Sequence, residues 1–211
     1  MYVKEEMGMK LVKICGITQE KEADVLNEML VDYVGFIQFV DWSKRNIPLE
    51  DAVRIMRQLD DRIHTVAVTV NPDAEQLDKI QNAGFSHIQI HGTISEKLLD
   101  RITLPVIKAF NGKDVSGYER YRKNDKIIGY IFDAHTPGSG ETFDWESIKN
   151  MPRDNKMRLV AGGIHPDNAA LAVEVTGFDG VDVSSGVEND NGIGKSSEKI
   201  RKLVNKIRAI E

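Results

Sequence analysis

The sequence predicts an α/β protein made of a single (β/α)8 TIM barrel with parallel strands, and two observations carry that prediction. Short apolar runs alternate with helical patterns along the whole chain of 211 residues. The apolar runs are nearly continuous, which is typical of parallel strands buried on both faces. Eight such units favour a closed barrel over an open sheet, and this length is at the short end for that fold.

The elements follow one another in a regular order. Strands are expected, in chain order, at residues 11–17, 33–39, 63–70, 87–91, 106–110, 127–133, 159–163 and 180–186. Helices are expected at 19–30, 49–59, from 72 onward, 95–101, within 115–123, 145–150, 166–175 and 197–210. Asn71 and Pro72 are expected to cap and start the third helix, because proline is favoured at the first helical position. The segment 115–123 is the weakest helical pattern, because it is largely polar.

Composition narrows the class of protein. The chain is 41% hydrophobic and 29% charged, as soluble globular proteins are. Its net charge of −5 provides no general attraction to nucleic acid or anionic lipid. We expect one barrel domain over residues 10–211 after a flexible extension over 1–9. That extension lacks the apolar core of a signal peptide, and no apolar run is long enough for a membrane span. A single cysteine, Cys15, excludes an internal disulfide and fits a reducing cytoplasm.

Two late strands end in small residues. Residues 159–163 finish in Gly162 and Gly163, and residues 180–186 finish in Ser184, Ser185 and Gly186. Glycine lets backbone N–H groups approach a ligand closely, and serine adds hydroxyl donors. Either end alone is better explained by an ordinary tight turn. Together, as the last two strand ends of a barrel, they predict a phosphate site.

Chemically active side chains stand at other strand ends. Cys15 closes the first strand, and Lys13 shares its face, either as a partner of the thiol or as a core lysine paired with a carboxylate. A buried free cysteine is also a common small hydrophobe. Asp133 closes the sixth strand, either as a loop cap or as a general acid whose pKa would have to rise by about 2–3 units. The glycine-rich loop 136–142 that follows is expected to fold over a ligand.

Further polar residues complete the predicted mouth. Arg45 lies in the loop after the second strand, where a guanidinium suits a planar carboxylate, although a solvated loop charge is an equal alternative. His91 is as well explained by a structural role as by ligand binding. His91 and His135 do not make a metal site. Motifs for dinucleotides or nucleoside triphosphates are absent from the sequence. Acid–base chemistry on a small phosphorylated metabolite is the natural inference.

At these residues the chain resembles the phosphoribosylanthranilate isomerase family of tryptophan biosynthesis. The resemblance runs from about Lys10 to Ile210. Its most specific segments are KICGIT at 13–18 and DVSSGVE at 182–188, near the two ends of the chain. Shorter matching segments lie in the same order between them, including 35–37, 43–45, 68–71, 89–92, 132–133, 142–145 and 161–168.

The resemblance implies the Amadori rearrangement of N-(5-phosphoribosyl)anthranilate to 1-(2-carboxyphenylamino)-1-deoxyribulose 5-phosphate, with no cofactor and no metal. By that resemblance Asp133 is the general acid, Cys15 the general base and Arg45 the ligand of the anthranilate carboxylate. The substrate's phosphate is matched by Gly162, Gly163, Ser184, Ser185 and Gly186, and His91 and Asp182 are expected to contact substrate as well. A cytoplasmic monomer or homodimer is expected.

Departures from the family pattern are few. Glu141 adds a negative charge to the loop after the sixth strand, Thr69 replaces a common aromatic residue, and Gln38 is polar within an apolar run. The alternatives are a sugar-phosphate epimerase, a flavin-phosphate oxidoreductase or a catalytically silent phosphate-ligand sensor. The epimerase would need metal ligands at several strand ends, and the flavin enzyme would purify yellow. Retention of both Cys15 and Asp133 argues against the sensor.

Overall fold

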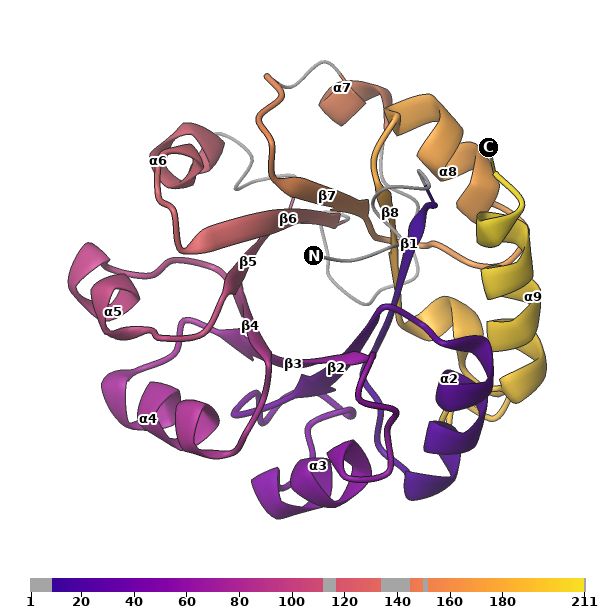
Figure 1. Cartoon of the computed structure of the whole chain (residues 1–211), viewed down its shortest axis with the longest axis horizontal. Coiled ribbons are helices and arrows are strands. Elements are labelled where there is room, and N and C mark those ends of the chain that lie inside the picture. Colours follow the sequence, from indigo (N-terminus) through magenta and orange to yellow (C-terminus); the bar gives the residue numbers. More distant parts are fainter. Residues whose placement is uncertain (1–8, 112–116, 134–144, 150–151, 211) are drawn as a thin grey trace.

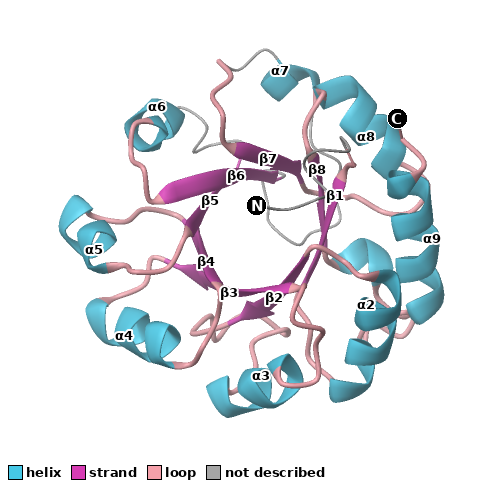
Figure 2. Ribbon diagram, viewed as in Figure 1, coloured by secondary structure: helices cyan, strands magenta, loops and turns pink. Residues whose placement is uncertain are grey.

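The computed structural model is a closed (β/α)8 barrel, with the strands ringed by helices (Figure 1). It describes residues 9–111, 117–133, 145–149 and 152–210. Within these residues eight parallel strands pair in sequence order, and β8 closes the ring on β1. Figure 2 shows the strands inside and the helices outside. The predicted fold class is therefore confirmed.

The elements have these bounds. The strands are β1 (Leu11–Cys15), β2 (Tyr33–Ile37), β3 (His64–Val70), β4 (His87–His91), β5 (Val106–Asn111), β6 (Ile127–Asp133), β7 (Met157–Val160) and β8 (Gly180–Val183). The α-helices are α2 (Ala23–Met29), α3 (Leu49–Met56), α4 (Ala74–Asn82), α5 (Glu96–Arg101), α6 (Tyr118–Arg122), α7 (Glu146–Lys149), α8 (Ala169–Thr176) and α9 (Ser197–Arg208). Two short 3-10 helices are η1 (Glu20–Glu22) and η3 (Ser185–Val187).

Both faces of the strands are buried, which explains their nearly continuous apolar sequences. Successive side chains of a strand point to opposite faces of the sheet. Those facing into the barrel form a compact interior cluster that includes Val66, Ile107 and Leu159. Those facing outward, such as Val12 and Ile14, join the larger core between strands and helices. The interior cluster is small, which leaves room for polar side chains toward the mouth of the barrel.

The helical patterns mark helices that bury an apolar stripe. The stripe of α9 is buried at Ile200, Leu203, Val204 and Ile207. The weak pattern at 115–123 contains the short helix α6, whose Tyr118 and Tyr121 are buried against Phe110 of β5. Aromatic packing, rather than an aliphatic stripe, attaches α6 to the barrel, so its sequence signal was weak.

The predicted start of the third helix was wrong. Helix α4 begins at Ala74, and its N-cap is Asp73, whose carboxylate accepts from the backbone N–H of Gln76 at 2.8 Å. Asn71 has a φ of 47°, and its Oδ1 accepts from the backbone N–H of Thr93 at 2.6 Å. Asn71 therefore joins the loops after β3 and β4. Asp73 provides the capping acceptor, because the side chain of Asn71 is engaged with the loop after β4.

The last two strands are shorter than predicted, and the helix between them starts later. Strands β7 and β8 end at Val160 and Val183, so the small residues predicted to end them lie beyond the strands, Ser185 and Gly186 in η3. Helix α8 starts at Ala169 instead of residue 166. Asn168 forms the preceding turn: its Oδ1 accepts from the N–H of His165 at 2.8 Å, and its Nδ2 donates to the Gly163 carbonyl at 2.9 Å. The glycine loop is thus tied to the start of α8.

The division into an extension over 1–9 and a barrel over 10–211 stays a prediction, because residues 1–8 lie outside the described part of the chain. Among the helices that the structure describes, none has both the length and the apolar character of a membrane span.

Candidate active site

Cys15 is the last residue of β1, and its side chain faces into the barrel, where the residue is 7% exposed. Its neighbour in the strand register is Gly35 of β2. A Cβ atom on Gly35 would lie 2.9 Å from the Cys15 Sγ and 3.0 Å from the Lys13 Nζ. Both separations are tighter than ordinary van der Waals contact, so the thiol and the ammonium occupy space that only a glycine leaves open.

Lys13 forms a buried ion pair with Asp182 of β8. The Lys13 Nζ lies 2.9 Å from the Asp182 Oδ1, and the strand register places the two residues side by side. Burial lowers the pKa of Lys13, but the Asp182 carboxylate and Cys15 outweigh it and leave that pKa above its ordinary value. Lys13 is therefore both a lysine paired with a carboxylate and a cation beside the thiol. The two roles that the sequence offered for Lys13 as alternatives are both present.

The Cys15 thiol lies among charges of both signs. Burial raises its pKa, and so does the Asp182 carboxylate, whereas the ammonium groups of Lys13 and Lys195 lower it. The net effect is a raised pKa. Lys195 is itself buried, and mainly because of this burial its pKa is lowered to about 8. Its Nζ donates to the backbone carbonyl of Ser184 at 3.0 Å. The thiol thus has two cations near it and little solvent.

Asp133 and His91 stand at the same end of the barrel as Cys15, because they are the last residues of the parallel strands β6 and β4. The Asp133 side chain is half-buried. Burial, Lys108 and Lys13 lower the pKa of His91 to about 3, so its ring is neutral at pH 7. The His91 Nε2 lies 2.8 Å from the Gln89 Nε2. With the amide in this orientation the ring accepts at Nε2 and carries its proton on Nδ1.

The loops after β7 and β8 touch each other, as the phosphate prediction requires. Gly162 and Gly163 have φ angles of 79° and 64°, a region that favours glycine. A Cβ atom on Gly186 would collide with the carbonyl oxygen of Ile164. Residues Ser184, Ser185 and Gly186 are half-buried. The loops that follow the two strands therefore lie against each other, as the residues of one anion site must.

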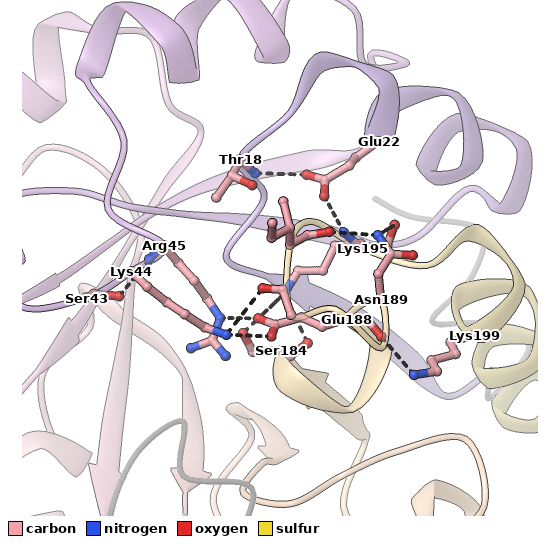
Figure 3. Close-up of polar contacts among 12 residues, drawn as sticks. Thr18, Glu22, Ser43, Lys44, Arg45, Ser184, Glu188, Asn189, Lys195 and Lys199 are labelled. Atoms are coloured by element: carbon pink, nitrogen blue, oxygen red, sulfur yellow. Dashed lines mark hydrogen bonds and ion pairs between the residues drawn. The ribbon is translucent and has the colours of Figure 1, made fainter.

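Arg45 lies in the loop between β2 and α3 and crosses over Gly16, the residue after Cys15. A Cβ atom on Gly16 would lie 2.6 Å from the Arg45 Cδ and 3.2 Å from the Ser184 Oγ. The Arg45 Nε donates to the Glu188 Oε1 at 2.5 Å (Figure 3). The stem of Arg45 therefore packs over the residue that follows Cys15, and its guanidinium lies against the loop after β8. The predicted carboxylate ligand and the predicted phosphate loop are thus neighbours.

Comparisons with known proteins agree with this arrangement. The family model described as N-(5'-phosphoribosyl)anthranilate (PRA) isomerase matches residues 12–206. A relative of that name from Thermoanaerobacter pseudethanolicus is 35% identical over 208 residues, which cover 96% of this chain and 100% of the relative. The chain belongs to the PRA isomerase family. The fold, the isomerase activity and the place in tryptophan biosynthesis that the sequence predicted are confirmed.

Solved structures of PRA isomerases share the fold. The enzyme from Thermotoga maritima superposes with a TM-score of 0.83 at 33% identity, covering 96% of this chain and 100% of that one. A PRA isomerase in complex with reduced 1-(o-carboxyphenylamino)-1-deoxyribulose 5-phosphate gives a TM-score of 0.78 at 31% identity, with coverage of 96% and 100%. A further structure describes the T. maritima enzyme as dimeric; it gives a TM-score of 0.80 at 32% identity, with the same coverage.

Sequence reasoning missed two polar residues of the candidate site, Glu188 and Lys195. Glu188 ends the DVSSGVE segment, so its place in a specific motif was the available signal. The backbone N–H of Lys195 donates to the Glu22 Oε1 at 2.5 Å, and the Glu22 Oε2 accepts from the N–H of Thr18 at 2.8 Å (Figure 3). Glu22 therefore ties the loop after β1 to the loop that carries Lys195, which places that ammonium near Cys15.

Two predictions about the mouth of the PRA isomerase barrel lie outside the described residues: the loop 136–142 with Glu141, and His135. Gln38 is described and has a structural role, because its side-chain amide donates to the carbonyls of Ile37 and Ile47 at 2.9 and 3.2 Å. It holds the loop that carries Arg45. Among the described residues no three His, Cys, Asp or Glu side chains are grouped as metal ligands.

Proposed function

We propose that this barrel mouth carries out the Amadori rearrangement of N-(5-phosphoribosyl)anthranilate with Asp133 as general acid and Cys15 as general base. The observation that carries the proposal is the setting of Cys15: a buried thiol at a strand's carboxyl end, with the cations Lys13 and Lys195 near it. A thiol of ordinary acidity is only a few per cent ionised at neutral pH, and nearby cations stabilise the thiolate that a base requires.

Asp133 acts first in the proposed sequence. Its carboxyl group donates a proton to the furanose ring oxygen, the bond between carbon 1 and that oxygen breaks, and the anthranilate nitrogen becomes an iminium. Asp133 stands at the end of β6 and is half-buried, so it is held by a strand and still reaches the mouth.

Cys15 acts second. Its thiolate removes the proton from carbon 2, and the electron pair of that bond forms the enamine. Because the iminium acidifies carbon 2, a base of modest strength suffices. The enamine then loses its hydroxyl proton and gains a proton at carbon 1, which gives 1-(2-carboxyphenylamino)-1-deoxyribulose 5-phosphate. Every proton that leaves the substrate is thus matched by one that enters it, and no oxidant, cofactor or metal is required.

The phosphate and the carboxylate of the substrate are assigned to different residues of the barrel mouth. The contacting loops at Gly162, Gly163, Ser184, Ser185 and Gly186 would bind the phosphate. Arg45 would bind the anthranilate carboxylate, and the neutral His91 offers an Nδ1 proton to the substrate. Asp182 is engaged with Lys13, so its contribution comes through that pair. Binding of a reduced product by a relative supports a phosphorylated small-molecule ligand of this kind.

We further propose a cytoplasmic enzyme, since its substrate belongs to tryptophan biosynthesis. For oligomeric state we propose a monomer or a homodimer; the T. maritima relative, which is described as dimeric, supports the latter. Size-exclusion chromatography with light scattering separates the two.

Rescue of a tryptophan auxotroph that lacks this isomerase tests the activity. Loss of the substrate's anthranilate-type fluorescence tests the roles. We expect Cys15→Ser and Asp133→Asn each to lower kcat by at least about 10²-fold, the usual scale for a general acid or base. Near wild-type turnover of either variant would remove that residue from the mechanism. We expect Arg45→Ala to raise KM mainly, and an unchanged KM would contradict carboxylate binding there.

A further inference from the structure

Glu188 lies where the cationic side chains of two loops meet. It follows η3, and its side chain is 10% exposed. Its Oε1 accepts from the Arg45 Nε at 2.5 Å, and its Oε2 accepts from the Lys44 Nζ at 2.9 Å. The Lys195 Nζ lies 3.6 Å from the same Oε1. Figure 3 shows the ends of Lys44 and Arg45 converging on this carboxylate. Glu188 therefore belongs to the mouth of the barrel, although the proposed mechanism gives it no task.

The contact between Glu188 and Arg45 uses one edge of the guanidinium. A guanidinium carries five N–H donors in a planar fork, one on Nε and two on each Nη. The ion pair with Glu188 is made through Nε. Within the described residues neither Nη of Arg45 has a hydrogen-bond acceptor. The edge formed by Nη1 and Nη2 can therefore receive a second carboxylate in the two-point geometry that arginine favours.

The stem of Arg45 is restrained as well. It packs over Gly16, where a Cβ atom would lie 2.6 Å from the Arg45 Cδ. Gly16 follows Cys15 directly, so one end of the arginine is placed relative to the thiol. Glu188 determines the other end by holding Nε. Together the two contacts place the open edge of the guanidinium at a defined position relative to Cys15.

A second carboxylate on the same guanidinium would be repelled by an uncompensated Glu188. The charge is offset by Lys44 and by Lys195. Burial raises the pKa of Glu188, but its hydrogen bonds to Arg45 and Lys44 outweigh burial. The net pKa is below the ordinary value. The carboxylate is thus ionised at pH 7 and surrounded by more positive than negative charge, which leaves the site favourable to an anion.

We propose that Glu188 is a positioning residue that holds the Arg45 guanidinium by Nε so that its remaining edge receives the anthranilate carboxylate. The inference rests on the proposed role of Arg45. It predicts that geometry at Glu188, more than charge, determines substrate affinity.

Three substitutions separate geometry from charge. Glu188→Gln keeps an Oε1 acceptor at the same reach and removes the charge. Glu188→Asp keeps the charge and shortens the reach by one methylene, and Glu188→Ala removes both. We expect Ala and Asp to raise KM by roughly tenfold or more with a smaller change in kcat, since a hydrogen bond to a charged group is lost. We expect Gln to recover KM to within about threefold of wild type, because the acceptor remains. A Gln variant as impaired as Ala would overturn the inference.

The double variant Arg45→Ala/Glu188→Ala decides whether Glu188 acts through Arg45. We expect its KM to equal that of Arg45→Ala alone, because the group that Glu188 orients is gone. If Glu188→Ala raises KM by the same factor in both backgrounds, the inference is wrong. If Arg45→Ala itself leaves KM unchanged, the proposed carboxylate site fails first, which distinguishes the two failures.

Binding of the reduced product analogue, measured by calorimetry, provides the same comparison without turnover and should follow KM. Lys202→Met is the matched control, because Lys202 forms an exposed ion pair with Asp167 away from the mouth and its side chain is 52% exposed. We expect its KM to stay within about twofold of wild type, as is usual for exposed ion pairs. Thermal melting by circular dichroism identifies any variant that fails to fold; if Glu188→Ala is lost in this way, the contrast between Gln and Asp still decides the outcome.

Discussion

The ammonium of Lys13 and the carboxylate of Asp182 form a buried ion pair of 2.9 Å between neighbouring strands, two residues before Cys15 in β1. The pair closes the barrel seam between the first and last strands. Because Lys13 also lies beside the thiol, the pair links the stability of the barrel to the charge state of the proposed base. Stability and activity should therefore respond differently to changes in the pair.

Removing one partner of the pair should destabilise the barrel strongly. Asp182→Asn leaves the Lys13 ammonium buried without its counter-charge, and we expect a loss of about 3–5 kcal/mol in the free energy of unfolding, measured by urea denaturation. Lys13→Met/Asp182→Leu, which replaces both charges with apolar groups, should recover most of that stability without recovering turnover. Glu28→Gln, which breaks the exposed pair with Arg201, is the control and should have a much smaller effect. If Asp182→Asn and Glu28→Gln lower the free energy of unfolding equally, the buried pair does not stabilise the barrel more than an exposed one.

The Lys195 ammonium should make Cys15 a better base at neutral pH. Because the thiol pKa is raised overall, the thiolate fraction grows with pH, and kcat/KM should rise between pH 7 and 9. Lys195→Met removes a charge that lowers the thiol pKa, so it should lower kcat/KM at pH 7 by roughly tenfold and move the lower part of the rising limb to higher pH. The difference from the wild type should shrink above about pH 8, where Lys195 itself loses its charge. Ultraviolet absorbance of the thiolate reports the same shift directly.

The control for Lys195 is Lys199→Met, which changes a lysine of the following helix that donates to the Glu188 carbonyl and to Asp190. Its pH profile should match that of the wild type. A profile for Lys195→Met that falls uniformly, without moving along the pH axis, would show that Lys195 does not act on the thiol.

Gly35 should be indispensable for reasons of space. In Gly35→Ala the new methyl group would lie 2.9 Å from the Cys15 Sγ, so the thiol or Lys13 must move. We expect kcat to fall by about 10²-fold, since a displacement of order 1 Å in a reacting group has that cost. Gly117→Ala is the matched control, because its Cβ would meet no atom within 4 Å. Wild-type kcat in Gly35→Ala would mean that the thiol tolerates displacement.

The opposite end of the barrel should make the enzyme sensitive to acid. His87 and His64 begin β4 and β3, and their rings pack 4.8 Å apart. Burial and the neighbouring His64 lower the pKa of His87 to about 4, and burial lowers that of His64 as well. The unfolded chain, with a histidine pKa near 6.5, then binds more protons than the folded one below that pH.

The stability that comes from keeping His87 neutral is therefore present above about pH 6.5 and is lost as pH falls toward 4, by up to about 3 kcal/mol. Urea denaturation at pH 7.5 and 5 measures this loss. His87→Gln, which does not titrate, should reduce the difference between the two pH values, whereas substitution of the exposed His165 should leave it unchanged. An equal pH dependence in His87→Gln would show that other groups cause the acid sensitivity.

The barrel itself was predictable from the order of apolar runs and helical stripes. Because every strand is buried on both faces, its sequence is apolar almost without interruption. The strand ends were predictable for the same reason: parallel strands bring their carboxyl ends together, so Cys15, His91 and Asp133 had to share one mouth. The resemblance at KICGIT and DVSSGVE then narrowed the chemistry to one reaction, which the family comparison confirmed.

Which side chains act on one another follows from the folded barrel and could not be predicted from the sequence. Lys13 and Asp182 are 169 residues apart in sequence, and their ion pair follows from the closure of β8 onto β1. Loops that are distant in sequence bring Glu188 into contact with Arg45 and place Lys195 near the thiol. The spacing of apolar residues along the chain indicates which faces of a strand or helix are buried. It does not indicate which charged side chains form an ion pair, because that depends on how the barrel closes.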